Sequence, residues 1–430
     1  MTTEQLYSYF EQCTSVTTDS RHCPEGSIFF ALKGDNFDGN KFALPSLEKG
    51  CRFAVVDDAR YVIDNRFILV NDVLEALQQL AKEHRRRLKT PIIGITGTNG
   101  KTTTKELIAA VLNQKFNTLY TQGNLNNHIG VPITLLQLTS AHQMAVVEMG
   151  ANHPGEIDLL ANIACPDYGI ITNVGKAHLE GFGSFEGVIR TKGELYDYIR
   201  TNGGSLFVNF DNKILNDLSA AIPRHGYGIQ SATGLVQGHV NGCSPFLELA
   251  WRKKDESIEY CLTTHLIGEY NVENVLAAIC IGLHFGVSPE QINTALSNYM
   301  PTNNRSQFKE TEHNRLIIDA YNANPTSMTA SLINFNHVKA DKKAVILGDM
   351  FELGAQSEEE HIKIVEMLKD SAFDKVLLVG ERLGAIPSDF DKFSTTGELI
   401  DYLTLHPLSG YTILVKGSHG MRLDTCVEKL

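Results

Sequence analysis

The chain has 430 residues, enough for about three domains, which excludes a single small binding module. Hydrophobic residues make up 43% and charged residues 20% of it, a balance typical of a globular enzyme and not of a disordered or collagen-like chain. The formal net charge of −12 would repel a nucleic-acid backbone, so we expect no nucleic-acid partner, and an anionic substrate needs a local positive pocket.

The eight cysteines are widely spaced and form no C-x-x-C pair, so the sequence predicts neither a disulfide framework nor a zinc site. The N-terminus lacks the order of a signal peptide, and the longest apolar stretch, residues 274–287, is too short to span a bilayer. We therefore expect a cytoplasmic protein without a membrane segment.

Residues 1–86 are predicted to form a small mixed α/β domain. Short apolar runs predict strands at residues 27–32, 52–56 and 66–70. A helix is expected from Val73, ending in the basic run 84–89. We interpret this run as a solvated helix end, with a phosphate contact as the alternative.

Residues 87–300 are predicted to form the central domain. From Pro91 a buried strand leads through a glycine turn into a helix, and further buried strands are expected at residues 144–148, 168–172 and 205–208. Such alternation implies a mostly parallel sheet covered by helices. A few antiparallel strands are expected between residues 226 and 266, followed by a helix over 272–285.

Residues 301–430 follow a break at Met300 and are predicted to form a third, Rossmann-like α/β domain. Its strands are expected at residues 315–320, 343–347, 375–379 and 411–415. The predicted fold class is therefore α/β in three domains, with a P-loop-type ATPase domain in the middle.

The turn between the first central strand and its helix reads GTNGKT, with the G-K-[ST] ending of a phosphate-binding loop. Its amides, its lysine and its threonine suit phosphates and Mg²⁺. The residues predicted to bind ATP are Gly97, Thr98, Asn99, Gly100, Lys101, Thr102 and Thr103. A plain glycine-rich turn is the alternative, and the usual longer spacing would need a glycine at Ile95.

The loop and the segments after it resemble the Mur ligase family of ATP-dependent amide-forming enzymes, and within it the MurF type. The resemblance is carried by GITGTNGKTTTKE, GNLNNHIGVPITLL, VEMGANHPGEI, NVGKAHLEGFGS, KGEL, GEYNVENVLAA, DAYNANPTSM, LGDMFELG and VKGSHG. It implies a ligase that uses ATP to join D-alanyl-D-alanine to UDP-N-acetylmuramoyl-tripeptide through an acyl phosphate. We expect a monomer, although the sequence does not determine the oligomeric state.

The resemblance also implies catalytic and metal roles. Glu148 ends a buried strand, where a carboxylate is costly unless it is paired, and with Thr102 it would hold Mg²⁺; a capping acid is the alternative. His178 and a Lys192 carbamylated by CO₂ would hold a second Mg²⁺. From the residues alone, His178 is a loop histidine, and Lys192 is a surface lysine at an expected helix start. Lys101, Lys192, His178 and Arg305 are the predicted catalytic residues.

The remaining family positions fall in all three domains. Asn274 would meet the adenine, and Arg305 and Asp319 the phosphate and ribose. Predicted substrate contacts are Asp19, Ser20, Arg21 and Lys33 for the UDP sugar, Asn126 and Asn127 for the reacting end, and Lys416 and Ser418 for the dipeptide. His128 and His419 depart from the family pattern and leave contacts there open.

Two alternatives stay open. One is another ligase of the same build, which adds a single amino acid to a peptidoglycan precursor or glutamate to folate. The other is a nucleotide switch that hydrolyses ATP without ligation. The sequence does not determine which diamino acid ends the tripeptide.

Overall fold

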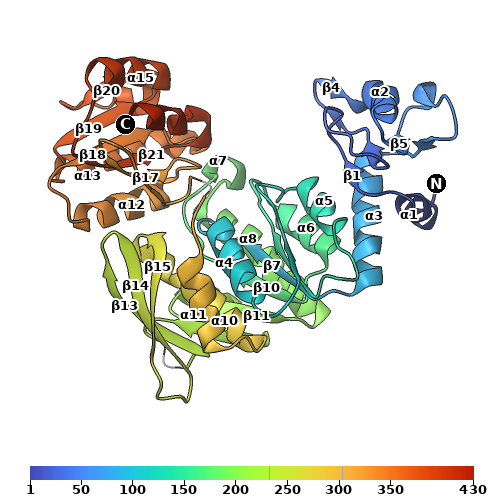
Figure 1. The fold of residues 1–430 in the computed structure, drawn as a ribbon, viewed down its shortest axis with the longest axis horizontal. Helices are drawn as coiled ribbons and strands as arrows, with labels where there is room; N and C mark the ends of the chain where they lie inside the picture. The colour runs from blue at the N-terminus through green and yellow to red at the C-terminus, as the bar shows by residue number, and fades with distance from the viewer. Residues whose placement is uncertain (232, 303) are drawn as a thin grey trace.

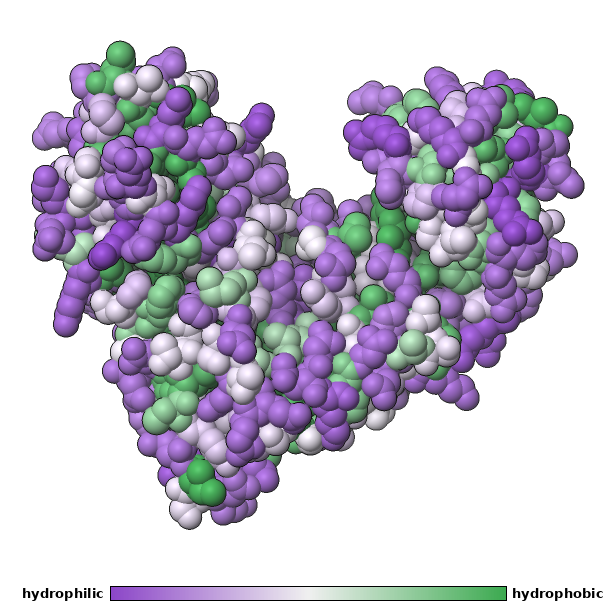
Figure 2. All heavy atoms as spheres, in the orientation of Figure 1, coloured by the Kyte–Doolittle hydropathy of each residue, from purple (hydrophilic) through white to green (hydrophobic). Residues whose placement is uncertain are grey.

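The computed structural model describes residues 1–231, 233–302 and 304–430, which form three main sheets from successive parts of the chain. Figure 1 shows the N-terminal part in blue and the C-terminal part in orange and red, both on the same side of the central part. The space-filling view in Figure 2 shows an open notch between these two lobes. The predicted three-part α/β fold class is confirmed.

The N-terminal sheet is parallel, in the order β1 (Val16–Thr17), β2 (Ile28–Phe30), β5 (Phe53–Val56) and β6 (Phe67–Leu69). The last three match the predicted apolar runs, whereas β1 is too short to give a pattern. The other elements here are α1 (Thr3–Phe10), the hairpin β3 (Lys33–Gly34) and β4 (Phe37–Asp38), α2 (Ala43–Glu48) and α3 (Val73–Leu88).

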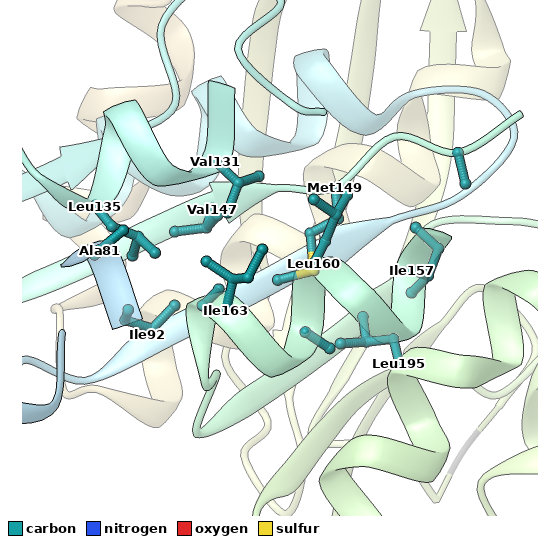
Figure 3. Packing of buried hydrophobic residues seen from close by; sticks show 14 of the residues in the cluster. Ala81, Ile92, Val131, Leu135, Val147, Met149, Ile157, Leu160, Ile163 and Leu195 are labelled. Atoms are coloured by element: carbon teal, nitrogen blue, oxygen red, sulfur yellow. The ribbon is translucent and has the colours of Figure 1, made fainter. Parts of the chain in front are cut away.

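Helix α3 (Val73–Leu88) packs against both the N-terminal and the central part. Asp72 caps its start by accepting a hydrogen bond from the Glu75 amide. Its buried apolar residues belong to one core that runs from the N-terminal sheet into the central part. Figure 3 shows Ala81 of α3 beside Leu135 and Ile92 of the central part.

The basic run at the end of α3 is only partly solvated, so our interpretation is wrong for two of its residues. Arg85 is buried and pairs with Asp167 of the central part at 2.8 Å. His84 is buried between the Tyr7 hydroxyl at 2.9 Å and the Leu138 carbonyl at 2.8 Å. These contacts tie the helix to its neighbours on both sides.

The central sheet places its predicted strands side by side. β7 (Ile92–Thr96) lies between β9 (Met144–Glu148) and β10 (Tyr168–Ile171), all parallel, so their carboxyl ends meet at one edge. The other strands are β8 (Thr118–Tyr120), β11 (Ser205–Asn209), β12 (Arg224–Gly228), β13 (Val236–Cys243), β14 (Phe246–Lys253) and β15 (Tyr260–Ile267). β13 to β15 pair antiparallel, as predicted.

Helices cover both faces of this sheet (Figure 1). They are α4 (Lys101–Leu112), α5 (Gly130–Leu135), α6 (Glu156–Ala164), α7 (Leu179–Phe182), α8 (Phe185–Asn202), α9 (Lys213–Leu218), α10 (Val272–His284) and α11 (Pro289–Asn298). The described helices include none long and apolar enough to cross a membrane.

The C-terminal sheet has the order β16 (Gln307–Glu310), β17 (Arg315–Asp319), β21 (Thr412–Lys416), β18 (Lys343–Gly348), β19 (Lys375–Val379) and β20 (Asp391–Phe393). Only β16 is antiparallel. Helices α12 (Pro325–His337), α13 (Ser357–Lys369), α14 (Glu381–Ala385) and α15 (Thr396–Leu405) flank it. The insertion of β21 between β17 and β18 brings Lys416 next to Asp319.

Candidate active site

The phosphate loop lies where β7 ends and α4 begins. Gly97 and Gly100 have φ angles of 147° and 77°, which L side chains rarely adopt. A side chain at Gly97 would also overlap the hydroxyl of Thr172 beyond β10. The first amides of α4 have no acceptor within their own helix, so this end attracts anions. The loop geometry therefore suits a phosphate group.

Lys101, the first residue of α4, is folded back over the loop. Its ammonium donates hydrogen bonds to the carbonyl oxygens of Gly97 and Thr98 at 2.8 and 3.1 Å. Burial lowers the pKa of Lys101 to about 8, against the opposing charge of Glu148. An anion in the loop would stabilise the protonated lysine.

Glu148 ends β9 and is 1% exposed. Its Oε1 accepts hydrogen bonds from Asn126 at 2.8 Å and from the Thr102 hydroxyl at 3.2 Å. Its Oε2 is buried and has no hydrogen-bond partner among the described residues. A buried carboxylate oxygen without a hydrogen bond is costly, and oxygen is the ligand that Mg²⁺ prefers. Glu148 and Thr102 therefore fit a divalent cation.

His178 and Lys192 both lie within the electrostatic reach of Lys101. Burial lowers the pKa of His178, and the charges of Lys101 and Lys192 lower it further, against Glu352. Its Nδ1 is hydrogen-bonded to Glu352 of the C-terminal part. Within the described ranges, no three His, Cys, Asp or Glu side chains form a group that could hold a metal ion. A second metal site here would need a further anion.

Lys192 lies in the interior of α8, so the expected helix start is wrong. The helix begins at Phe185, and Ser184 caps it by accepting a hydrogen bond from the Gly187 amide. Lys192 is also not a surface residue: it is 2% exposed, with Nζ 3.2 Å from the Ala151 carbonyl and 5.1 Å from the centroid of the Phe182 ring. Burial, with the charge of Lys101, lowers the pKa of Lys192 to about 7.

Two residues assigned to different ligands form one ion pair in the C-terminal part. Asp319 and Lys416 end the neighbouring parallel strands β17 and β21, and their side chains form a salt bridge. Asp319 also accepts hydrogen bonds from the Ser306 amide and the Ser331 hydroxyl, each at 3.2 Å. Both residues of the pair line the same cavity.

The C-terminal part contacts the phosphate loop directly. Asn324, which caps α12, donates a hydrogen bond to Asn99 at 2.8 Å. Arg305 lies over the ring of Tyr321, with its guanidinium carbon 3.8 Å from the centroid. Loop and C-terminal part thus enclose a shared space.

This space is a cavity of about 950 Å³. The predicted residues that line it are Thr98, Asn99, Gly100, Lys101, Thr103, Asn126, Asn127, Glu148, His178, Asn274, Arg305, Asp319 and Lys416. Asn274 also accepts a hydrogen bond from the Thr104 hydroxyl at 3.0 Å and packs against Gly100. The volume suits a nucleotide-sized ligand with room for a second group.

The other predicted residues do not line this cavity. Gly97, Thr102, Lys192 and Ser418 are among them, and Ser418 accepts a hydrogen bond from the Phe351 amide at 2.9 Å. In the N-terminal part, the hydrogen bonds from Arg21 lower the pKa of Asp19 to about 2. Lys33 pairs with Asp57 at 2.6 Å, and the Ser20 carbonyl accepts a hydrogen bond from Lys49. Contacts of these residues with a substrate stay predictions.

Three residues that the structure places at the site, Tyr321, Asn324 and Lys105, were not predicted from the sequence. Tyr321 and Asn324 lie in the DAYNANPTSM segment, which carried the resemblance but gave no physical reason to select them. Lys105 follows Lys101 by four residues, a spacing that places both on one side of α4 and could have indicated it.

Models of Mur ligase domains match three successive parts of the chain. The Mur ligase family catalytic domain matches residues 12–85, the Mur ligase middle domain 95–282, and the Mur ligase glutamate ligase domain 304–419. The chain belongs to the Mur ligase family, as the resemblance predicted.

Two curated relatives are named UDP-N-acetylmuramoyl-tripeptide–D-alanyl-D-alanine ligase. That of Bacillus subtilis is 34% identical over 429 residues, which cover 96% of this chain and 92% of the relative. That of Escherichia coli is 35% identical over 428 residues, with 97% and 93% covered.

Solved structures agree over the whole fold. MurF from Acinetobacter baumannii has a TM-score of 0.87 and 31% identity, and covers 100% of this chain and 98% of its own. MurF ligase from Thermotoga maritima in complex with ADP has a TM-score of 0.86 and 25% identity, with 98% and 97% covered.

Proposed function

We propose that this chain is an ATP-dependent ligase that joins D-alanyl-D-alanine to UDP-N-acetylmuramoyl-tripeptide in peptidoglycan precursor synthesis. Relatives that it matches over nearly their whole length are named for this reaction. The structural observation that carries the proposal is the shared cavity. It brings the phosphate loop and Glu148, one oxygen of which lacks a hydrogen bond, together with charged residues of the C-terminal part.

ATP binds in this cavity, between the central and C-terminal parts. The amides at the start of α4 face its phosphates, and Lys101 exchanges its two carbonyl partners for phosphate oxygens. Asn274 lies at the adenine end and Asp319 at the ribose. A related structure that contains ADP supports the assignment of the nucleotide.

The reaction has two steps. The terminal carboxylate of the tripeptide attacks the γ-phosphorus, which gives an acyl phosphate and ADP. The amine of D-alanyl-D-alanine then attacks the acyl carbon, loses a proton and displaces inorganic phosphate, which leaves an amide. Lys101, Arg305 and the loop amides compensate the charge that develops on the transferred phosphoryl group.

The metal residues divide into two groups. Thr102 and Glu148 would hold one Mg²⁺, which when bound neutralises phosphate charge. Lys192 is carbamylated in our proposal: its neutral amine bonds to the carbon of CO₂ and loses a proton, which makes an anion. Beside His178, this anion supplies the charge that a second Mg²⁺ site lacks.

The substrates approach from different lobes. Asp19, Ser20, Arg21 and Lys33 take the UDP sugar, while Asn126 and Asn127 contact the reacting end near Glu148. The dipeptide enters from the C-terminal part, near Lys416 and Ser418. We place the domain boundaries at 86/87 and 300/301, so that each domain binds a different part of the substrates.

We also place the enzyme in the cytoplasm as a monomer. All eight cysteines are free thiols within the described part of the chain, as a reducing compartment favours.

The test is an ADP-release assay with UDP-N-acetylmuramoyl-tripeptide, in which D-alanyl-D-alanine is added, omitted or replaced by a single amino acid. We expect sustained ADP release only with the dipeptide. Equal turnover with a single amino acid would favour another ligase of the family, and turnover without either co-substrate would favour a nucleotide switch.

A further inference from the structure

Lys105 is a buried cation that none of the proposed steps uses. It lies on α4 and is 0% exposed, although a lysine is rarely enclosed without a reason. Its Nζ lies 3.9 Å from Oε2 of Glu148 and 3.8 Å from Oε1 of Glu106. The centroid of the Tyr120 ring is 5.8 Å away.

The ammonium of Lys105 lies next to Glu148 but outside the lining of the cavity. Glu148 lines the cavity and Lys105 does not. The carboxylate oxygen that it faces is Oε2, which has no hydrogen-bond partner in the described ranges. At 3.9 Å the two groups interact as charges rather than through a hydrogen bond.

We infer that Lys105 is a positioning residue that acts through Glu148. It supplies a fixed positive charge that offsets the carboxylate, so a divalent cation binds well only when nucleotide phosphates add negative charge. This inference rests on the proposed function, because it takes Glu148 as a cation ligand. Lys101 differs from Lys105, because it lines the cavity and can move to a phosphate.

The charge count gives the sign of the effect. Lys101, Lys105 and Arg305, whose charge acts on both lysines, oppose Glu106 and Glu148, which gives a formal sum of +1. Removal of Lys105 brings this sum to zero and removes the positive charge next to Glu148, so a divalent cation is repelled less and binds better without help from nucleotide. If Lys105 had only a structural role, its replacement would instead loosen the site and weaken binding of the cation.

The experiment measures Mn²⁺ binding by electron paramagnetic resonance on the full chain, with and without a non-hydrolysable ATP analogue. In the wild type we expect weak binding alone and tight binding with the analogue. Lys105→Met should tighten nucleotide-free binding by about tenfold or more, and Lys105→Arg should restore the wild-type value. Glu148→Gln added to Lys105→Met should remove the gain.

Lys82→Met, on the exposed face of α3, makes the same charge change at the surface and should leave binding unchanged. If Lys105→Met does not fold, Lys105→Gln, which keeps a polar head group, takes its place. Nucleotide-free binding that is unchanged or weaker in the folded variant overturns the inference. A wild type that binds no Mn²⁺ even with the analogue contradicts the metal part of the proposed function instead.

Discussion

The unusual environment of Lys192 leads to a test of its carbamylation. An ordinary lysine has a pKa of 10.5, and burial lowers that of Lys192 to about 7. At pH 7 the neutral fraction of the amine therefore rises from roughly one in 3000 to about one half, and only the neutral amine adds CO₂. The burial of the side chain raises its capacity for this reaction by about three orders of magnitude.

The perturbations are replacement of Lys192 and removal of CO₂, and the assay is ADP release. Lys192→Ala and Lys192→Arg should each lose about 10²- to 10³-fold in kcat, the cost of one charged group in a preorganised site. Acetate or formate should restore part of the rate to Lys192→Ala, because it supplies a carboxylate in the vacated space. Lys213→Arg, on the exposed surface, serves as the control.

The pH dependence has a definite sign. Between pH 8 and pH 6 the neutral fraction of an amine with a pKa near 7 falls from about nine tenths to about one tenth. Activity restored by bicarbonate after CO₂ depletion should fall in the same direction. Full activity of Lys192→Arg in CO₂-depleted buffer would refute the reasoning and remove Lys192 from the site.

Three further substitutions test the cavity. Lys101→Ala should leave the circular dichroism spectrum unchanged and lower kcat by at least about 10²-fold, because it removes a phosphate-directed charge from an enclosed site; a loss under threefold would exclude this role. Gly100→Ala should weaken binding of an ATP analogue, measured by calorimetry, because the new Cβ would lie 2.7 Å from Oδ1 of Asn274 at a φ of 77°; wild-type affinity would show that the loop can shift. Asp319→Ala should raise the KM for ATP more than it changes the KM for the dipeptide, since it removes the carboxylate that we assign to the ribose; the reverse pattern would assign Asp319 and its partner Lys416 to the dipeptide.

Much of the fold was predictable because its strands are buried on both faces. Short, continuous apolar runs such as residues 92–96 and 343–347 are typical of strands in a sheet that helices cover on both faces. Both runs are strands in the structure. Edge strands such as β16 and β20 carry polar residues and were missed. The order of strands was also out of reach, because it depends on contacts between distant segments rather than on local pattern.

The site was predictable where a motif fixes local geometry, as in the phosphate loop. It was not predictable where the role of a residue depends on neighbours from distant parts of the sequence. Nothing local distinguishes Lys192 from a surface lysine, and its burial depends on Ala151 and Phe182 from other elements. The Asp319–Lys416 pair likewise exists only because β21 inserts beside β17.

The core that α3 shares with the central part has a consequence for the order of folding during synthesis. This core extends from Leu6 to Ile222, so the first domain cannot bury its helix fully when it leaves the ribosome. The apolar side of α3 becomes buried only after α5 and α6, which pack against it, have been synthesised. One core of the C-terminal part, by contrast, lies wholly between Leu316 and Leu430 and can close without the rest. The apolar side of α3 is therefore exposed on the nascent chain for longer than the core of the C-terminal part, which closes within one short stretch of synthesis.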